Sequence, residues 1–254
     1  MANVYCLRSP KITNIIVFGR SGLYFKAALD CHFPLKIIAD LADWCAIEKP
    51  IDVEMCTLFT AKFSLFSPIY DLDPELGGII LCAKNKQFYN NLRNVYGSEK
   101  IIFHFTMLTQ SNTDLPEEII CNLPIAQHHW QDCMIISHTT GKKAQTIFKK
   151  IEILKQFTLW SAETNFLRKH QIRLHAHEVG IKILGENVYD KIPTPFLSDF
   201  KSKVKSNRKG ILMPLYPSIC IYLPEISFFY GENIIKIASP LPDKLTTMLK
   251  IIQK

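Results

Sequence analysis

Short stretches rich in β-branched and aromatic residues follow one another closely between residues 79 and 238. Runs of this composition are typical of β-strands. The predicted strands are Ile79–Ala83, Ile101–Leu108, Met134–Ser137, Thr146–Ile153, Phe157–Ala162, Ile219–Tyr222, Ile226–Tyr230 and Ile234–Ala238. Gly231-Glu232-Asn233 separates the last two as a hairpin-like turn. Because the predicted strands outnumber the helices and adjoin one another, the sequence predicts an α+β fold with a mixed, largely antiparallel sheet and flanking helices.

Helical periodicity is confined to a few segments. Apolar residues recur on one helical face in Pro34–Glu48, Lys86–Tyr96 and Asp243–Ile252, and we expect a helix in each. A further helix is expected from Lys169 to Val179, with Ile172 facing the core.

Composition narrows the class of protein but not its function. Of the 254 residues, 48% are hydrophobic and 21% are charged, as in soluble globular proteins, and the net charge of +7 is compatible with a polyanionic partner without requiring one. No two of the eight cysteines have C-x-x-C spacing, which favours reduced thiols in a cytoplasmic protein. No apolar run is long enough for a membrane span, so we expect no membrane partner, and the absence of heptads favours a monomer.

Four motifs stand in order along the second part of the chain. The first, YDLDPELGGIILCAKN, covers Tyr70–Asn85, and the second, GKKAQT, covers Gly141–Thr146. The third is RKHQIRLH at Arg168–His175, which continues into ILGENVY at Ile183–Tyr189. The fourth, ASPLPDKL, covers Ala238–Leu245.

Together these motifs resemble those of the RluA-type RNA pseudouridine synthases. The resemblance covers about residues 70–254, which we expect to form the catalytic core without an S4 domain, with residues 1–69 as a divergent N-terminal part. It implies that Asp73 is the catalytic aspartate, either as a nucleophile or by stabilising charge at C1′. Arg173, or alternatively Arg168, is expected to lie within salt-bridge reach of Asp73 and to favour its ionised form. The resemblance implies no cofactor and no metal.

The same comparison implies a set of substrate contacts. Phe103 or Ile102 stands where the family has an active-site tyrosine, and Phe103 could stack on uracil. His170 and Gln171, in the third motif, are expected to bind the substrate; no cysteine or carboxylate pattern completes a metal site with the neighbouring histidines. Clustered cations suggest contacts to RNA phosphates, or else a solvated loop, at Lys201, Lys203, Lys205, Arg208 and Lys209.

Several positions depart from the family pattern. Asp71 replaces the arginine two residues before the catalytic aspartate, Leu76-Gly77 replaces Thr-Ser, and Leu167 replaces a glycine. The resemblance therefore implies one of two functions. The first is isomerisation of uridine to pseudouridine in ribosomal or transfer RNA, and the alternative is a catalytically weakened relative that binds RNA as a chaperone or assembly module.

Overall fold

The computed structural model describes residues 4–9, 12–18, 23–25, 35–59, 66–200 and 213–253. The basic cluster that begins at Lys201 therefore lies outside the described residues. The chain forms two compact units. Unit 1 consists of residues 1–105, 163–169 and 223–240, and unit 2 consists of residues 106–162, 170–222 and 241–254. Among the helices of the described ranges, none is long and apolar enough to cross a membrane.

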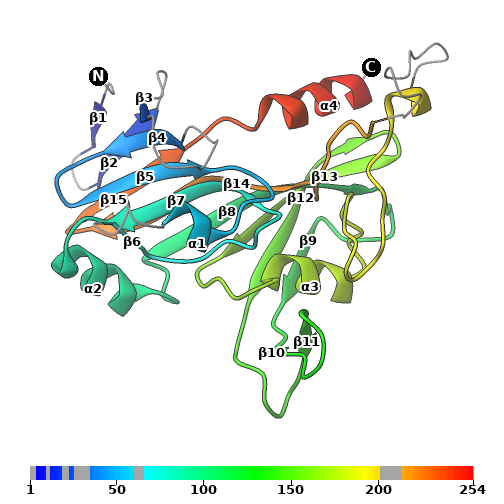
Figure 1. Cartoon of the computed structure of the whole chain (residues 1–254), viewed down its shortest axis with the longest axis horizontal. Helices are drawn as coiled ribbons and strands as arrows, with labels where there is room; N and C mark the ends of the chain where they lie inside the picture. The colour runs from blue at the N-terminus through cyan, green and yellow to red at the C-terminus, as the bar shows by residue number, and fades with distance from the viewer. Residues whose placement is uncertain are drawn as a thin grey trace. The chain divides into compact units, whose positions relative to one another are not determined.

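Unit 1 is built on a sheet whose order is β3-β4-β5-β7-β14, with β15 paired to both β14 and β2 (Figure 1). Its strands are β1 Val4–Ser9, β2 Ile12–Phe18, β3 Leu23–Phe25, β4 Leu35–Asp40, β5 Trp44–Lys49, β6 Ser67–Pro68, β7 Gly77–Ala83, β14 Ile221–Tyr230 and β15 Asn233–Ala238. Its helices are α1 Met55–Leu58 and α2 Lys86–Val95. The β15–β2 pair is parallel, whereas β5 and β7 are antiparallel. The sheet is thus mixed and largely antiparallel, as predicted.

One predicted helix is wrong. The described part of this segment, residues 35–48, forms the antiparallel pair β4–β5, with Lys36 opposite Glu48 and Asp40 opposite Cys45. A second strand partner decides the structure, because β5 also pairs along its whole length with β7. Leu41, which the helical pattern placed on the apolar face, is exposed in the turn.

The core of unit 1 lies around β7, in which all seven residues are buried. Helix α2 covers this region through its apolar face. Phe88 stacks on Trp44 of β5 with ring centroids 6.4 Å apart and meets Phe228 of β14 edge-on at 6.2 Å. The helix begins where Asn85 caps it, since the Asn85 side chain accepts a hydrogen bond of 2.8 Å from the Phe88 amide. The prediction of a helix at 86–96 is confirmed.

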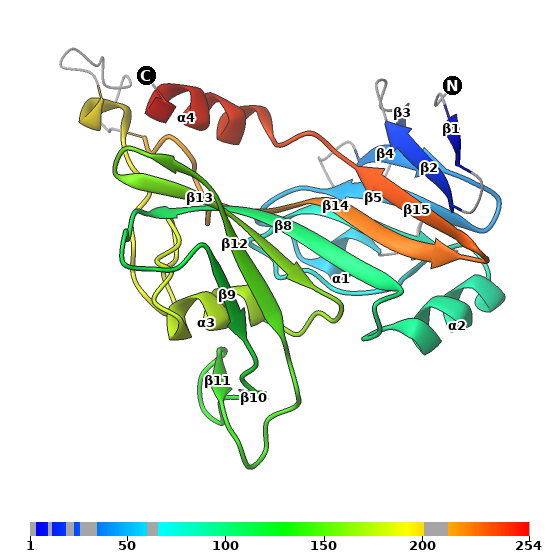
Figure 2. The same ribbon diagram turned by 180° about the vertical axis from the view of Figure 1, so that it is seen from behind.

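Unit 2 contains a sheet of order β8-β13-β12-β9 and a separate pair, β10–β11 (Figure 2). Its elements are β8 Ile101–Gln110, β9 Glu118–Cys121, β10 Ile125–Gln127, β11 Met134–Ile136, β12 Thr146–Leu154, β13 Phe157–Thr164, α3 Gln171–Glu178, the 3₁₀ turn η1 Leu197–Asp199 and α4 Asp243–Gln253. Strands β8, β13 and β14 each have residues in both units. Helix α4 confirms the helix predicted from Asp243, and the strands predicted at 219–222 and 226–230 belong to one strand, β14.

Gly78 is a position at which a side chain has no room. Its φ is +144°, and a Cβ atom there would lie 2.5 Å from the Cβ atom of Leu223. We expect Gly78→Ala to lower the free energy of unfolding by roughly 2–5 kcal/mol, from overpacking and backbone strain together. Urea denaturation measures the loss. Gly231→Ala is the control, because Gly231 also has a positive φ but nothing within 4 Å of its would-be Cβ. Its loss should be only about 1–2 kcal/mol, and equal losses in the two variants would contradict the steric argument.

Candidate active site

Asp73 lies in a tight turn that leads into β7. The Leu76 amide donates a hydrogen bond of 3.0 Å to the carbonyl of Asp73, which closes a turn over residues 73–76. Asp at the first position and Pro74 at the second are the residues that a type I turn prefers. The side chain of Asp73 is half-buried, whereas Leu72 is buried and Asp71 is exposed. The turn therefore gives Asp73 a fixed backbone.

A buried lysine holds this turn in place. Lys49, at the end of β5, is 0% exposed, and its ammonium donates hydrogen bonds to the carbonyls of Pro74 at 2.8 Å and Leu76 at 2.6 Å. A third bond of 3.1 Å goes to the carbonyl of Pro50. Burial lowers the pKa of Lys49 to about 8, and the negative charges of Asp73 and then Asp71 oppose that shift. Lys49 is thus a cation that favours the ionised form of Asp73.

Lys49 interacts electrostatically with Asp71 as well, but more weakly than with Asp73. Partial burial raises the pKa of Asp71, and a hydrogen bond with the Leu72 backbone and the charges of Lys49 and Lys169 oppose this rise. The carboxylate that replaces the family's arginine is therefore exposed and lies within the electrostatic range of two lysines.

Phe103, the predicted stacking residue, is 0% exposed in the aromatic core of unit 1. Its ring meets that of Tyr70 edge-on at 4.6 Å and that of Tyr96 at 5.9 Å. The Tyr70 hydroxyl donates to the carbonyl of Ile79 at 2.5 Å, which fixes the ring against β7. Burial raises the pKa of Tyr96 to about 12, so its hydroxyl stays protonated. Sequence reasoning missed both tyrosines, because their contacts with Phe103 are not local.

Arg168 belongs to the same unit as Asp73. Its guanidinium lies 4.4 Å over the ring of Phe166, which in turn meets Tyr96 edge-on at 4.5 Å. The Tyr96 hydroxyl accepts a hydrogen bond of 3.1 Å from the Leu167 amide, so the backbone before Arg168 is fixed. Burial lowers the pKa of Arg168, and the negative charge that Tyr96 gains only at high pH, when its hydroxyl ionises, opposes the shift.

Arg173, the other predicted partner of Asp73, lies on α3 in unit 2. It is buried, and its Nε and Nη2 atoms donate to the two carboxylate oxygens of Glu186 at 2.7 and 2.9 Å. Burial pushes the pKa of Glu186 up, but the hydrogen bonds and charge of Arg173 outweigh it and the pKa is lowered. Glu186 also accepts from the amides of Val188 and Tyr189 at 2.7 and 3.3 Å. This bidentate ion pair therefore connects α3 to the loop that follows it.

The other polar residues of the third motif also anchor α3. His170 has a left-handed backbone with a φ of 56°, and its Nδ1 lies 3.0 Å from the hydroxyl of Tyr189. The side-chain amide of Gln171 donates hydrogen bonds to the backbone carbonyl of Gln145 at 3.0 Å and to the hydroxyl of Thr146 at 3.3 Å. His175 bonds Thr146 as well, and burial lowers the pKa of His175, so its ring is neutral. The described residues contain no group of histidine, cysteine and carboxylate side chains that could hold a metal.

The titration of Lys49 should be measurable as a change of stability with pH. The pKa of folded Lys49 is about 8, whereas that of an exposed lysine is about 10.4. The unfolded chain therefore binds more protons here between these values, and the free energy of unfolding should rise by up to about 3 kcal/mol across that pH range. Lys49→Met removes this rise and lowers stability at pH 7 by about 2–5 kcal/mol, because three carbonyls lose their donor.

Urea denaturation between pH 7.5 and 10.5 tests this expectation. Lys36→Met is the matched control, since Lys36 is a half-buried lysine on β4 whose ammonium bonds the Glu48 carboxylate at 2.7 Å. The control should keep the rise with pH, and a Lys49→Met protein that keeps it too would contradict the assignment.

Comparison with known proteins finds similarity to RNA pseudouridine synthases. A model of the RNA pseudouridylate synthase family matches residues 60–178. Ribosomal large subunit pseudouridine synthase D of Buchnera aphidicola subsp. Schizaphis graminum is 31% identical over 124 residues, which are 49% of this chain and 39% of the relative. An uncharacterized RNA pseudouridine synthase of Helicobacter pylori is 27% identical over 195 residues, which are 72% of this chain and 61% of the relative. The chain thus spans between 39% and 61% of the length of these relatives.

Solved structures share the fold. Human RNA pseudouridylate synthase domain containing 4 superposes with a TM-score of 0.67 at 14% identity, covering 85% of this chain and 92% of that protein. Human RNA pseudouridylate synthase domain containing 1 gives a TM-score of 0.60 over the same share of this chain. The motifs and the family model agree over residues 60–178, and in this part the chain is similar to RNA pseudouridine synthases, while the two human structures share its fold.

Proposed function

We propose that the chain is an RNA pseudouridine synthase that isomerises uridine in ribosomal or transfer RNA, with Asp73 as its catalytic residue. The observation that carries the proposal is the placement of Asp73 in a turn held by the buried ammonium of Lys49. A carboxylate beside a cation is ionised at neutral pH, which is the form that either proposed role requires.

The reaction requires no external reactant. The C1′–N1 bond of uridine breaks, the uracil turns, and C1′ joins C5; the proton on C5 is lost and N1 gains one. The Asp73 carboxylate either attacks as a nucleophile or stabilises the positive charge that develops at C1′. Arg168 or Arg173 is proposed as the cation that pairs with it, in addition to Lys49. The uridine must first leave the base stack, as in other enzymes that modify bases.

The remaining predicted residues are proposed to position the substrate. Phe103 forms part of an aromatic core with Tyr70 and Tyr96, which supports a role in shaping the floor on which a base rests. His170 and Gln171 are proposed to act through the start of α3, and their hydrogen bonds to Tyr189 and Thr146 support that role. The cluster at Lys201, Lys203 and Lys205 is proposed to contact phosphates of the RNA.

The second candidate function is RNA binding without turnover. Two observations favour it. Phe103 has no hydroxyl where the family has a tyrosine, and Asp71 places a negative charge where the family has a cation. Neither change removes the Asp73 carboxylate. Each removes a polar or cationic side chain that the family has near its catalytic aspartate.

Replacement of the proposed catalytic group separates the two functions. Asp73→Asn keeps the shape of the side chain but removes its charge, so we expect loss of pseudouridine formation without loss of RNA binding. Mapping pseudouridine in total RNA from cells with and without the gene identifies the target. A site that disappears on deletion should return with the parent protein and not with Asp73→Asn. If no site depends on the gene, the enzyme proposal fails and the binding function stands.

The electrostatic effect of Asp71 can be tested by restoring a cation. The Asp71 carboxylate repels RNA phosphates, so Asp71→Arg should increase RNA affinity and single-turnover rate. The dependence of binding on salt should become steeper by about one unit for one new phosphate contact. Asp71→Asn, which removes the charge without adding one, should give an intermediate affinity. An Asp71→Arg protein that folds normally but neither binds nor reacts better would contradict this reasoning.

A further inference from the structure

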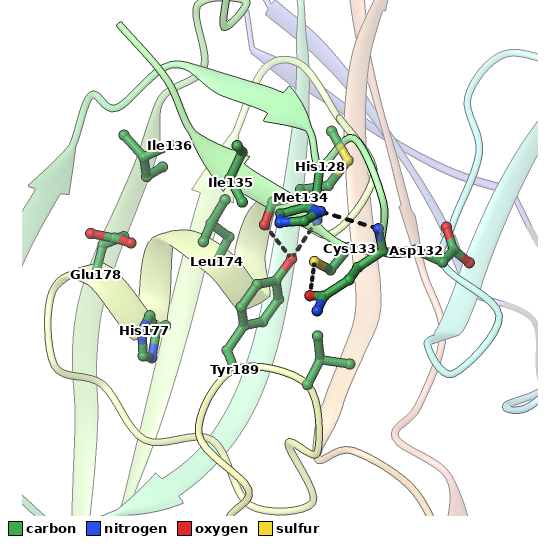
Figure 3. A pocket seen from close by; sticks show the side chains of 12 residues that line it. His128, Asp132, Cys133, Met134, Ile135, Ile136, Leu174, His177, Glu178 and Tyr189 are labelled. Carbon is green, nitrogen blue, oxygen red and sulfur yellow. Dashed lines mark hydrogen bonds between the residues drawn. The ribbon is translucent and has the colours of Figure 1, made fainter.

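Unit 2 contains a groove of about 600 Å³ that the proposed chemistry does not use. It lies between the β10–β11 hairpin, the outer turn of α3 and the loop that carries Tyr189. In Figure 3 the Tyr189 hydroxyl points to the backbone at Met134, while Leu174, His177 and Glu178 project from the helix. The rings of Tyr189 and His177 lie 6.0 Å apart and are tilted by 33°. The groove falls in the size range of pockets for small organic groups.

One edge of β11 faces this groove with its backbone. The His128 amide bonds the carbonyl of Cys133 at 3.0 Å, and the Ser137 amide bonds that of Pro124 at 3.0 Å. Since bonded and non-bonded pairs alternate in an antiparallel ladder, the N–H and C=O groups of Met134 and Ile136 point away from β10. Those of Met134 are bonded at 3.0 and 3.2 Å to the hydroxyl of Tyr189, which lines the groove.

Ile136 therefore presents its N–H and C=O on the same edge, roughly 7 Å further along the strand. Within the described ranges, no hydrogen-bond partner is found for either group. One donor and one acceptor side by side complement the Watson–Crick edge of an unpaired base, such as N3–H and O4 of uracil. A single residue offers too few bonds to hold an added peptide strand, which pairs along several residues.

The tip of the same hairpin carries an exposed aromatic ring. Trp130 is 92% exposed, the largest exposure among the large hydrophobic residues described. Its backbone is held in place, because Nδ1 of His128 accepts hydrogen bonds of 3.1 Å from the amides of both Trp130 and Gln131. A solvent-exposed indole on such a backbone is a surface on which a base can stack.

The charges around the groove favour a base inside it and phosphates outside it. Glu178 lines the groove, so it repels a phosphate but can accept from an N–H or amino group of a base. Lys142 pairs with Ile125 on the edge of β10 that faces away from β11, and Lys142 is exposed. A strand of RNA that crosses the hairpin thus meets a cation on one side of the hairpin and an acceptor in the groove on the other side.

We propose that this groove binds one unpaired base of single-stranded RNA through the backbone of Ile136, while Trp130 stacks on a neighbouring base. That RNA is the partner rests on the proposed function. The site lies wholly in unit 2, and none of the residues that form it is one to which we assign a catalytic role.

Fluorescence anisotropy with a labelled uridine decamer tests the inference. Trp130→Ala should weaken binding by about 5- to 150-fold, the loss of one base–aromatic stack. Ile136→Pro removes the outward N–H, together with a side chain that packs on the cluster of Ile125, Met134 and Leu174, and the loss of that N–H should weaken binding by about 2- to 13-fold. Ile120→Ala is the matched control, because Ile120 is 53% exposed on β9 of the same unit; its affinity should equal that of the parent. An abasic decamer should bind the parent and Trp130→Ala equally.

Photo-crosslinking of the parent protein to a 4-thiouridine decamer keeps the test valid should Ile136→Pro unfold. Crosslinks should map to residues 128–136. Unchanged affinity in Trp130→Ala together with crosslinks elsewhere would overturn the inference, and would leave the groove to a peptide partner.

The two proposals fail separately. A parent protein that binds the decamer through Trp130 but forms no pseudouridine removes the proposed function and leaves this site standing. Pseudouridine formation with binding that is insensitive to Trp130 does the reverse.

Discussion

The buried ammonium of Lys49 joins two parts of unit 1 that lie far apart in the sequence. It stands at the end of β5, opposite Gly78 of β7, and bonds the carbonyls of the turn that contains Asp73. Without it, buried carbonyls would lack donors at a cost of about 1–3 kcal/mol each. With it, the desolvation of a charge must be offset, and Asp73 and Asp71 supply the opposing charge. Stability of the turn and ionisation of Asp73 therefore depend on the same cation.

A second buried charge organises unit 2 in the same way. Arg173 and Glu186 cancel one another inside the unit, and Glu186 also accepts two backbone amides of the loop that leads to Tyr189. Tyr189 then bonds both His170, at the start of α3, and Met134 of the hairpin. Removing either charge would leave the other buried without its partner, which typically costs 3–5 kcal/mol. The third motif is thus as much a structural device as a functional one.

The sequence predicts best what local pattern decides. Helix α2 follows from apolar spacing and the Asn85 cap, and β8 follows from its β-branched and aromatic residues. The segment 34–48 fails because its apolar residues fit either period, and pairing with β7, more than thirty residues away, decides between them. The role of Lys49 was also hidden, because its acceptors lie 25 and 27 residues later in the chain. The third motif singled out Arg173, but no local signal showed that its Nε and Nη2 atoms would bond Glu186.

The departures from the family pattern bear on binding more than on chemistry. The turn, Lys49 and Asp73 are all present. Asp71, however, repels RNA phosphates, whereas the arginine that the family has at this position attracts them. Each lost phosphate contact reduces the slope of log affinity against log salt concentration by about one unit. It also weakens RNA binding at low salt. Stacking of a base on an exposed indole contributes about 1–3 kcal/mol and does not depend on counterion release. The proposed stack on Trp130 would therefore recover affinity for RNA that Asp71 loses, without changing Asp73, the carboxylate that the proposed reaction needs.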